Sequence, residues 1–159
     1  MLLLLSLQRT YTTQKMPTDL EIFPRRTQEI IREWANIVQT KHAITEDEED
    51  EIYMGDPLLI IEWDDAGLQR RGIQRATIVN TIRGVQGCQP FPQNAQPPSN
   101  SIFYIVDTPN IQAQQIVLNI CSMLRRTYGQ RGVPTLGRMY SVVAERKGIL
   151  RVGEIDDVF

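Results

Sequence analysis

The stretch at residues 108–129 constrains this chain most, because every signal in it describes one long helix. Thr108 can cap the helix, and Pro109 falls at the first helical position, where its missing N–H costs nothing. Gly129 is placed to close the helix in a left-handed conformation. Apolar residues recur between these ends at three- and four-residue steps: Ile111, Ala113, Ile116, Val117, Ile120, Leu124 and Tyr128. One face of the helix therefore needs a sheet or another helix to cover it.

The remaining patterns predict an α+β domain. Residues 26–41 form a second amphipathic helix, residues 57–63 and 101–106 are short apolar runs typical of buried strands, and residues 138–155 predict a β-hairpin. The run at 77–82 fits either period, and its five β-branched residues favour a strand. We expect a mainly antiparallel sheet of about five strands with two helices packed on one face. The apolar stripe of the second helix is Ile30, Ile31, Trp34, Ile37 and Val38.

The connections between these elements carry turn signals. Residues 64–67 predict a turn. Residues 86–100 predict a long loop that contains Cys88 and four prolines, and we expect an extended projection that touches a neighbouring chain. Cys121 lies beside the apolar stripe of the long helix and is expected in the core.

A chain of 159 residues that is 42% hydrophobic fits one globular domain. We assign residues 20–155 to that domain, residues 1–19 to an N-terminal arm or leader, and residues 156–159 to an acidic C-terminal tail. The leader could be a mitochondrial presequence, an arm that binds a neighbouring chain, or an unneeded extension. Its apolar run is too short to span a bilayer, so we expect no membrane association.

Charge is strongly segregated along the chain. Residues 1–45 carry six basic and four acidic side chains, residues 46–65 carry ten acids and no base, and residues 66–151 carry eleven bases and two acids. Three more acids follow, so the small net charge of −2 hides an acidic block and a basic body. Fourteen of the 17 basic residues are Arg, the cation that protein interfaces and phosphate sites favour.

No catalytic motif is present, and we expect neither an enzyme nor a cofactor. Two cysteines and one histidine, His42, cannot supply the four ligands of a structural zinc site. The acidic run at 45–51 lacks the spacing and central Gly of a calcium loop. A nuclease-like set at Glu62, Asp64, Asp65 and Asp107 has its Glu145-x-Lys147 element in a predicted turn, which does not fit. No metal site is therefore assigned.

The charged residues are candidates for an interface instead. In one interpretation the arginines meet the acidic block of a neighbouring subunit; in the other, arginines with Tyr128 and Tyr140 contact phosphates and stack on nucleic-acid bases. Because the chain supplies its own acids, the first interpretation is favoured. The candidate residues are Glu46, Asp47, Glu48, Glu49, Asp50, Glu51, Arg70, Arg71, Arg75, Arg125, Arg126, Arg131 and Arg138.

The expected element order, a helix, three strands, a helix and two strands, resembles over residues 20–155 the small ring-forming subunits of the head–tail junction of tailed bacteriophages, the tail-terminator and connector class. That resemblance implies a non-enzymatic structural protein of the virion, acting as a homo-oligomeric ring with other structural proteins, in the virion or the cytoplasm. The alternative is a nucleic-acid-binding subunit of a ribonucleoprotein, located in the mitochondrion if the leader is a presequence.

Overall fold

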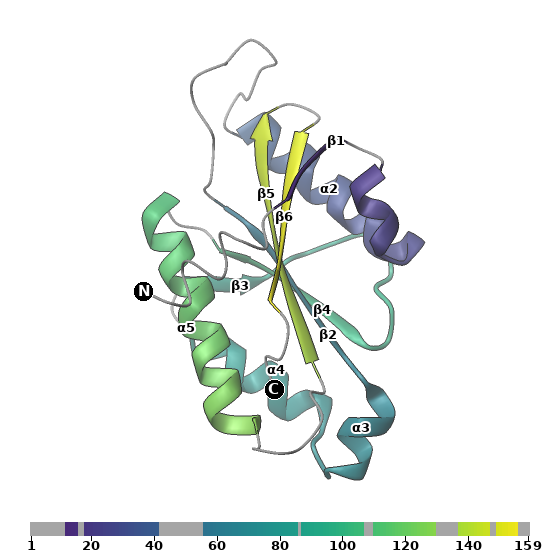
Figure 1. The fold of residues 1–159 in the computed structure, drawn as a ribbon, viewed down its shortest axis with the longest axis vertical. Coiled ribbons are helices and arrows are strands. Elements are labelled where there is room, and N and C mark those ends of the chain that lie inside the picture. The colour runs from purple at the N-terminus through teal and green to yellow at the C-terminus, as the bar shows by residue number, and fades with distance from the viewer. Residues whose placement is uncertain are drawn as a thin grey trace.

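The computed structural model describes residues 12–15, 18–41, 56–85, 87–106, 110–129, 137–146 and 149–155, which form one sheet flanked by helices (Figure 1). The strands are β1 (Thr12–Lys15), β2 (Leu58–Trp63), β3 (Cys88–Pro90), β4 (Ser101–Val106), β5 (Gly137–Arg146) and β6 (Ile149–Ile155). The helices are the 3-10 helix η1 (Thr18–Ile22) and the α-helices α2 (Arg25–Lys41), α3 (Asp65–Arg70), α4 (Arg75–Arg83) and α5 (Asn110–Tyr128).

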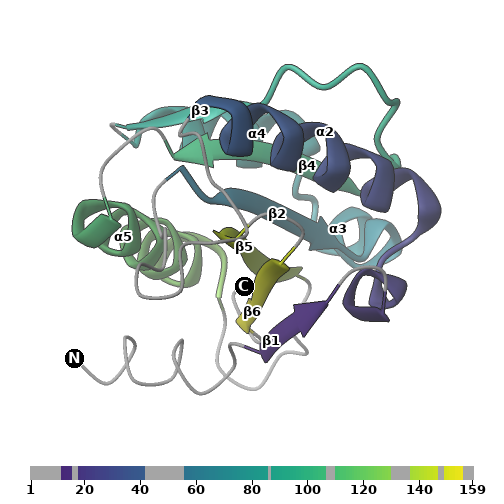
Figure 2. The same ribbon diagram turned by 90° about the horizontal axis from the view of Figure 1, so that it is seen from above.

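The sheet has six strands in the order β1-β6-β5-β2-β4-β3, and neighbouring strands are antiparallel (Figure 2). Both β4 and β5 pair with the central strand β2, so they run parallel to each other, and α5 connects them. The expected α+β class with an antiparallel sheet is confirmed. Residues 12–15, which the sequence assigns to an arm or leader, add β1 to the outer edge of β6.

The prediction that both long helices pack on one face of the sheet is wrong. Alternate residues of β2 enter two separate cores: Leu59 and Ile61 pack with α4 and α5, whereas Leu58 and Ile60 pack with α2. Figure 1 shows α5 and α2 on opposite sides of the strands. A strand covered on both faces reads as a continuous apolar run, which is the pattern that residues 57–63 display.

The two long helices form where the sequence predicts them. In α5, Val117, Ile120 and Leu124 are buried against the sheet, and the predicted core position of Cys121 is confirmed. Ile37 of α2 departs from its predicted stripe and is 50% exposed, because the buried face turns toward Ala35 and Thr27 instead. Thr108 and Pro109 lie outside the described residues.

Gly129 closes α5, but not in the left-handed conformation expected of it. Its backbone φ is not positive, in contrast to Gly72 at +68°. Its N–H donates to the Arg125 carbonyl at 2.9 Å, and a Cβ added to Gly129 would lie 2.5 Å from that same oxygen. The helix end therefore needs glycine because of this close approach.

The predicted strand at 77–82 is helix α4. Ile78 and Ile82 are both fully buried and lie four residues apart, so the helical period puts them on one face in contact with the core of β2 and α5. The preference of β-branched residues for strands depends on context and is overridden here by that burial. The turn predicted at 64–67 is the start of helix α3, in which Leu68 is buried.

The loop predicted at 86–100 is shorter than expected and is held by its own chain. Cys88 lies on β3, is only 7% exposed and is a free thiol, as is Cys121. Farther along, the carboxylate of Glu33 on α2 accepts the backbone N–H groups of Asn94 and Ala95, both at 2.8 Å. These contacts attach the loop to α2, and its predicted contact with a neighbouring chain stays a prediction.

The buried face of α5 gives a direct test of this packing. Replacing the fully buried Ile120 with Ala should lower the free energy of unfolding by roughly 2–5 kcal/mol, because the removed atoms leave a cavity between α5 and the sheet. Denaturant unfolding followed by circular dichroism measures the loss. Ser122→Ala, on the exposed face of the same helix, is the control and should change stability little. A loss of under about 0.5 kcal/mol for Ile120→Ala would contradict the packing.

Candidate interaction site at the arginine-rich end

Two arginine clusters that are far apart in the sequence meet at the end of the sheet where β2 finishes. Arg71, just after α3, donates from Nη2 to the carbonyl oxygen of Tyr128, the last residue of α5. The Tyr128 hydroxyl is 2.9 Å from Oγ1 of Thr81 on α4. These two hydrogen bonds bring the ends of α3 and α5 together beside α4. The arginines of residues 70–75 and 125–126 therefore belong to one region, which we call the arginine-rich end: Arg70, Arg71, Arg75, Arg125, Arg126 and Arg138.

Arg75, the first residue of α4, joins this region to the sheet. Its guanidinium lies over the ring of Trp63, 5.5 Å from the ring centroid, and its Nη2 is 3.5 Å from the carbonyl oxygen of Ser101. Trp63 ends β2 and Ser101 begins β4, so Arg75 contacts the sheet where β2 ends and β4 begins. The ring of Trp63 is fixed in turn, because its Nε1 donates to Asp65 Oδ1 at 2.7 Å.

Arg138 and Arg70 have carboxylate partners but remain exposed. Arg138 on β5 is paired across the strands with Glu62, and its Nη1 is 3.8 Å from Oε1 of Glu154. Arg70 Nη2 is 3.7 Å from Asp64 Oδ2, and the two side chains are 70% and 55% exposed. Ion pairs this exposed contribute at most about 1 kcal/mol and exchange partners readily. An incoming carboxylate could therefore compete for these cations.

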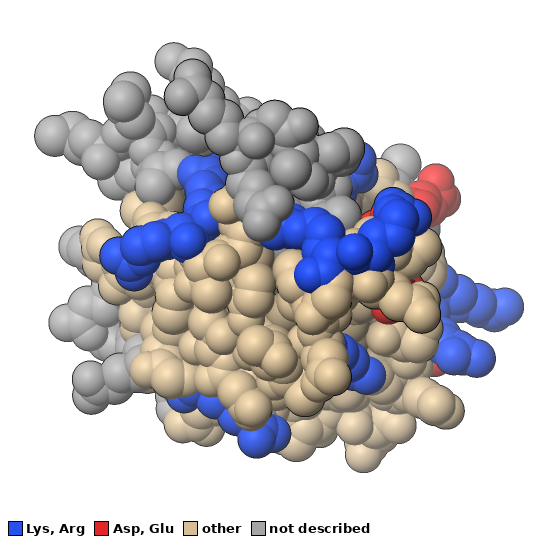
Figure 3. All heavy atoms as spheres, turned by 90° about the horizontal axis from the view of Figure 1, so that it is seen from below, with Lys and Arg blue, Asp and Glu red and all other residues tan. Residues whose placement is uncertain are grey.

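Figure 3 shows the end of the molecule that is lowest in Figure 1, where α3, α4 and the last turn of α5 lie. Lys and Arg side chains form a band across this surface, and acidic side chains are few on it. Arg126 is exposed and forms no ion pair within the part of the chain that the structure describes. Arg131 lies outside the described residues.

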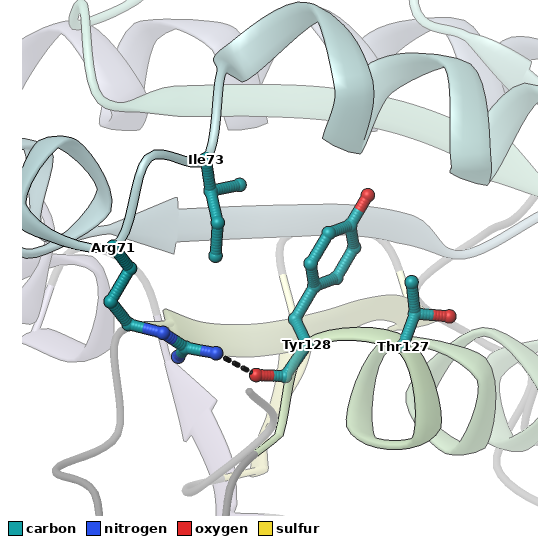
Figure 4. Close-up of a pocket in the computed structure, with 4 residues that line it drawn as sticks. All are labelled: Arg71, Ile73, Thr127 and Tyr128. Atoms are coloured by element: carbon teal, nitrogen blue, oxygen red, sulfur yellow. Dashed lines mark hydrogen bonds between the residues drawn. The ribbon is translucent and has the colours of Figure 1, made fainter.

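A hollow lies between Arg71 and the end of α5. It has a volume of about 360 Å³ and is lined by Arg71, Ile73, Thr127 and Tyr128. Figure 4 shows the Arg71 guanidinium directed at the carbonyl of Tyr128, while the phenol of Tyr128 points away from it toward α4. The hydrogen bond thus fixes one cation at the mouth of the hollow.

The half-buried Glu62 and the buried Tyr140 form a pair under this surface. Burial raises the pKa of the Glu62 carboxyl, while a hydrogen bond from Tyr140 and the charge of Arg138 oppose that rise. Burial also raises the pKa of Tyr140 to about 12, helped by the charges of Glu62 and Glu154. The acids of the nuclease-like set therefore serve separate contacts: Glu62 with Tyr140, Asp64 with Arg70, and Asp65 with Trp63. Asp107 and the side chains of Glu145 and Lys147 lie outside the described part.

The acidic block at 46–51 also lies outside the described residues, but both of its flanks are fixed. Lys41 ends α2, and its Nζ is 3.1 Å from Oδ2 of Asp56, whose side chain is only 4% exposed. The Asp56 carbonyl accepts a hydrogen bond from Trp34 Nε1 at 3.0 Å. Asp56 precedes the first residue of β2, whereas the arginine-rich end lies at the last. The flanks of the block are therefore separated from the arginine-rich end by the length of a six-residue strand, roughly 17 Å.

Within residues 18–41, 56–85 and the later described segments, no three His, Cys, Asp or Glu side chains lie close enough together to bind a metal ion. The helices of those segments include none with the length and apolar character that crossing a membrane requires. The sequence analysis did not identify Asp56, Thr81 and Trp63, whose contacts hold the residues at the start of β2 and at the arginine-rich end in position. Their roles depend on contacts between distant segments, which no local pattern signals.

No protein-family model matches this chain, and neither a curated protein nor a solved structure matches it. What the chain does must therefore be inferred from the chemistry and placement of its own side chains.

The Glu62–Tyr140 pair predicts a pH dependence of stability. Because the pKa of Glu62 is raised in the folded state, the folded chain binds the proton more tightly than the unfolded chain does. The free energy of unfolding should therefore fall as the pH rises above the ordinary Glu pKa, and level off once the folded protein is also deprotonated. Glu62→Gln should flatten this part of the profile, measured by urea unfolding between about pH 4 and 8.

The control for that profile is Glu29→Gln, an exposed Glu on α2. It should leave the slope of the wild type unchanged. Equal slopes for the wild type and Glu62→Gln would show that burial of this carboxyl has no influence on stability.

Proposed function

We propose that this chain is a non-enzymatic structural subunit that assembles with copies of itself, the arginine-rich end of one copy receiving the acidic block of the next. The observation that carries the proposal is that Lys41 and Asp56, the described residues on either side of the acidic block, lie at the opposite end of β2 from the arginine-rich end. The Lys41–Asp56 pair holds the flanks of the block where β2 begins, and Arg75 over Trp63 marks the cationic end where β2 finishes.

Opposite charges at opposite ends favour a head-to-tail contact between subunits. Such a contact uses two different surfaces of each copy, so it repeats until it closes into a ring or continues as a filament. Each exposed pair adds under about 1 kcal/mol. Several pairs at one interface steer association and fix its direction, and salt screens them.

The alternative, a nucleic-acid-binding subunit, loses part of its support from the burial of the aromatic rings. Base stacking needs an accessible ring face. Tyr128 is 7% exposed, Tyr140 is 6% exposed and Trp63 is 4% exposed, and all three rings pack in the cores. At the described residues of the arginine-rich end, that alternative keeps the charge contacts to phosphates. Carboxylates supplied by the chain itself suit the same guanidinium groups equally well.

A virion ring of the tail-terminator and connector class is our proposal for the kind of assembly. It is supported by the α+β sheet and by the head-to-tail arrangement of charge, which is the arrangement that a ring needs. The element order differs from the order on which the resemblance rests: residues 75–83 form helix α4 in place of a strand, and β1, η1, α3 and β3 are additional elements.

Charge reversal tests the proposed contact. Replacing Glu48, Glu49 and Asp50 with Gln, Gln and Asn should weaken self-association and flatten its salt dependence, because the cationic end loses its partner. Reversal of the acidic block to Lys, or of Arg70 and Arg126 to Glu, should abolish assembly in each variant alone. An equimolar mixture of the two reversed variants should recover association, because each then offers the other a complementary surface. Size-exclusion chromatography with light scattering measures the mass.

The same chromatography distinguishes the two functions when absorbance at 260 nm is recorded. Assembly of the Gln, Gln, Asn variant like the parent at low salt, or failure of the mixture to recover, would contradict the proposed contact. Co-purified nucleic acid that is lost on Arg70→Glu and Arg126→Glu would support the alternative instead.

A further inference from the structure

A second concave site begins at Arg75 of the arginine-rich end and lies between α4 and the loop that follows β3. It has a volume of about 180 Å³. One wall is a stripe of α4 at four-residue steps, Arg75, Val79 and Arg83. The opposite wall comes from the end of β3 and the loop after it: Pro90, Phe91, Gln93 and Pro97. The floor comes from β4: Ser101, Ile102, Phe103 and Tyr104. We call this site the α4 groove.

The loop that forms one wall of the α4 groove is held in place, before any ligand binds, by contacts with α2 and β4. Glu33 of α2 holds the backbone N–H groups of Asn94 and Ala95, and the Phe91 N–H donates to the Phe103 carbonyl at 3.0 Å. The side chain of Phe91 is 4% exposed. A ligand would therefore meet a rigid wall and need not order the loop on binding.

Two polar groups of the groove lack hydrogen-bond partners among the described residues. Oε1 of Gln93 is buried and accepts no hydrogen bond. The hydroxyl of Tyr104, a residue only 2% exposed, likewise has no hydrogen bond within the described segments. A buried acceptor without a donor is destabilising, so Gln93 favours a ligand that supplies one, whereas the Tyr104 hydroxyl is not fully buried and is accessible to such a ligand. Gln93 needs a donor, and Tyr104 can donate to an acceptor.

The electrostatic field in the groove is positive. Burial raises the pKa of Tyr104 to about 12, and Arg83 and Arg75 both act against that rise, which places both cations near the hydroxyl. Arg83 is exposed and forms no ion pair in the described part of the chain. The two arginines are eight residues apart on one helix, about 12 Å along its axis. An elongated anion fits this spacing better than a compact one.

We infer that the α4 groove is the receptor for the acidic segment 46–51 of a second copy of this chain. This inference rests on the proposed self-assembly and names the surface that receives the block. A peptide with consecutive carboxylates offers anionic groups to Arg75, Arg83 and the Tyr104 hydroxyl, and backbone N–H donors to Gln93. Free phosphate is a compact anion and does not extend over two arginines about 12 Å apart along the helix axis. The chain itself contains a segment with both kinds of group, six carboxylates in succession.

The test uses a fluorescent peptide of residues 44–52 and, as receptor, the full chain with Glu48, Glu49 and Asp50 replaced by Gln, Gln and Asn, so that its own block does not compete. Fluorescence anisotropy should show binding that weakens with salt, and the peptide with Gln and Asn in place of its acids should not bind. Arg83→Gln in the receptor should weaken binding roughly tenfold, because it removes a charged hydrogen bond. Tyr104→Phe, which keeps the ring, should also weaken it.

The matched control is Arg26→Gln, which removes the same charge from exposed α2 on the other face of the sheet and should bind like the parent receptor. Thermal melts check that each variant is folded. Equal affinities of Arg83→Gln and Arg26→Gln would overturn the inference, and the proposed assembly would still stand if it remained dependent on the acidic block. A ten-nucleotide oligouridylate that binds in place of the peptide, and is weakened by Arg83→Gln, would also overturn it and assign the groove to nucleic acid.

Discussion

The rest of the structure depends on the burial of β2 on both of its faces. Leu58, Leu59, Ile60 and Ile61 are all fully buried, and successive residues enter opposite cores. One core closes under α2, and the other closes under α4 and α5. Because β2 is antiparallel to both β4 and β5, those two strands run parallel to each other, and α5 connects them. Lys41 and Asp56, the described residues on either side of the acidic segment, lie at one end of this short strand, and Arg75 lies at the other.

Local pattern was sufficient for the long helices and for four of the strands, because their periodicity and their burial agree. The helix at 25–41, the helix at 110–128, the strands at 58–63 and 101–106, and the hairpin from 137 to 155 all lie where the sequence indicates. Local pattern failed at α4, where five β-branched residues favour a strand but Ile78 and Ile82 meet the core only at the helical period. It also failed to place the helices, because nothing in an amphipathic stripe says which face of a distant sheet it will cover.

At the candidate site too, the sequence shows which residues are present but not which of them meet in the folded chain. The sequence identifies the arginines as unusual in number and kind, but their meeting depends on the Arg71–Tyr128 and Thr81–Tyr128 contacts, which join residues 57 and 47 positions apart. The α4 groove was hidden from sequence reading for a different reason. Arg75, Val79 and Arg83 form a stripe only if the segment is helical, so the wrong assignment of 77–82 as a strand also concealed the groove.

The burial of the aromatic rings decides how the arginine-rich end can recognise a partner. The rings of Trp63, Tyr128 and Tyr140 are buried, and their polar atoms form hydrogen bonds within the subunit. These rings therefore help to position the nearby arginines but are not accessible to a partner. What the surface presents is a set of guanidinium groups on separate elements around a hollow and a groove, among them Arg70 in an exposed ion pair with Asp64. In the proposed contact, the number and spacing of the anionic groups would set the affinity, and salt would weaken the binding. A partner with carboxylates in succession on one flexible segment gains most from it, because one ordering cost is shared among several contacts.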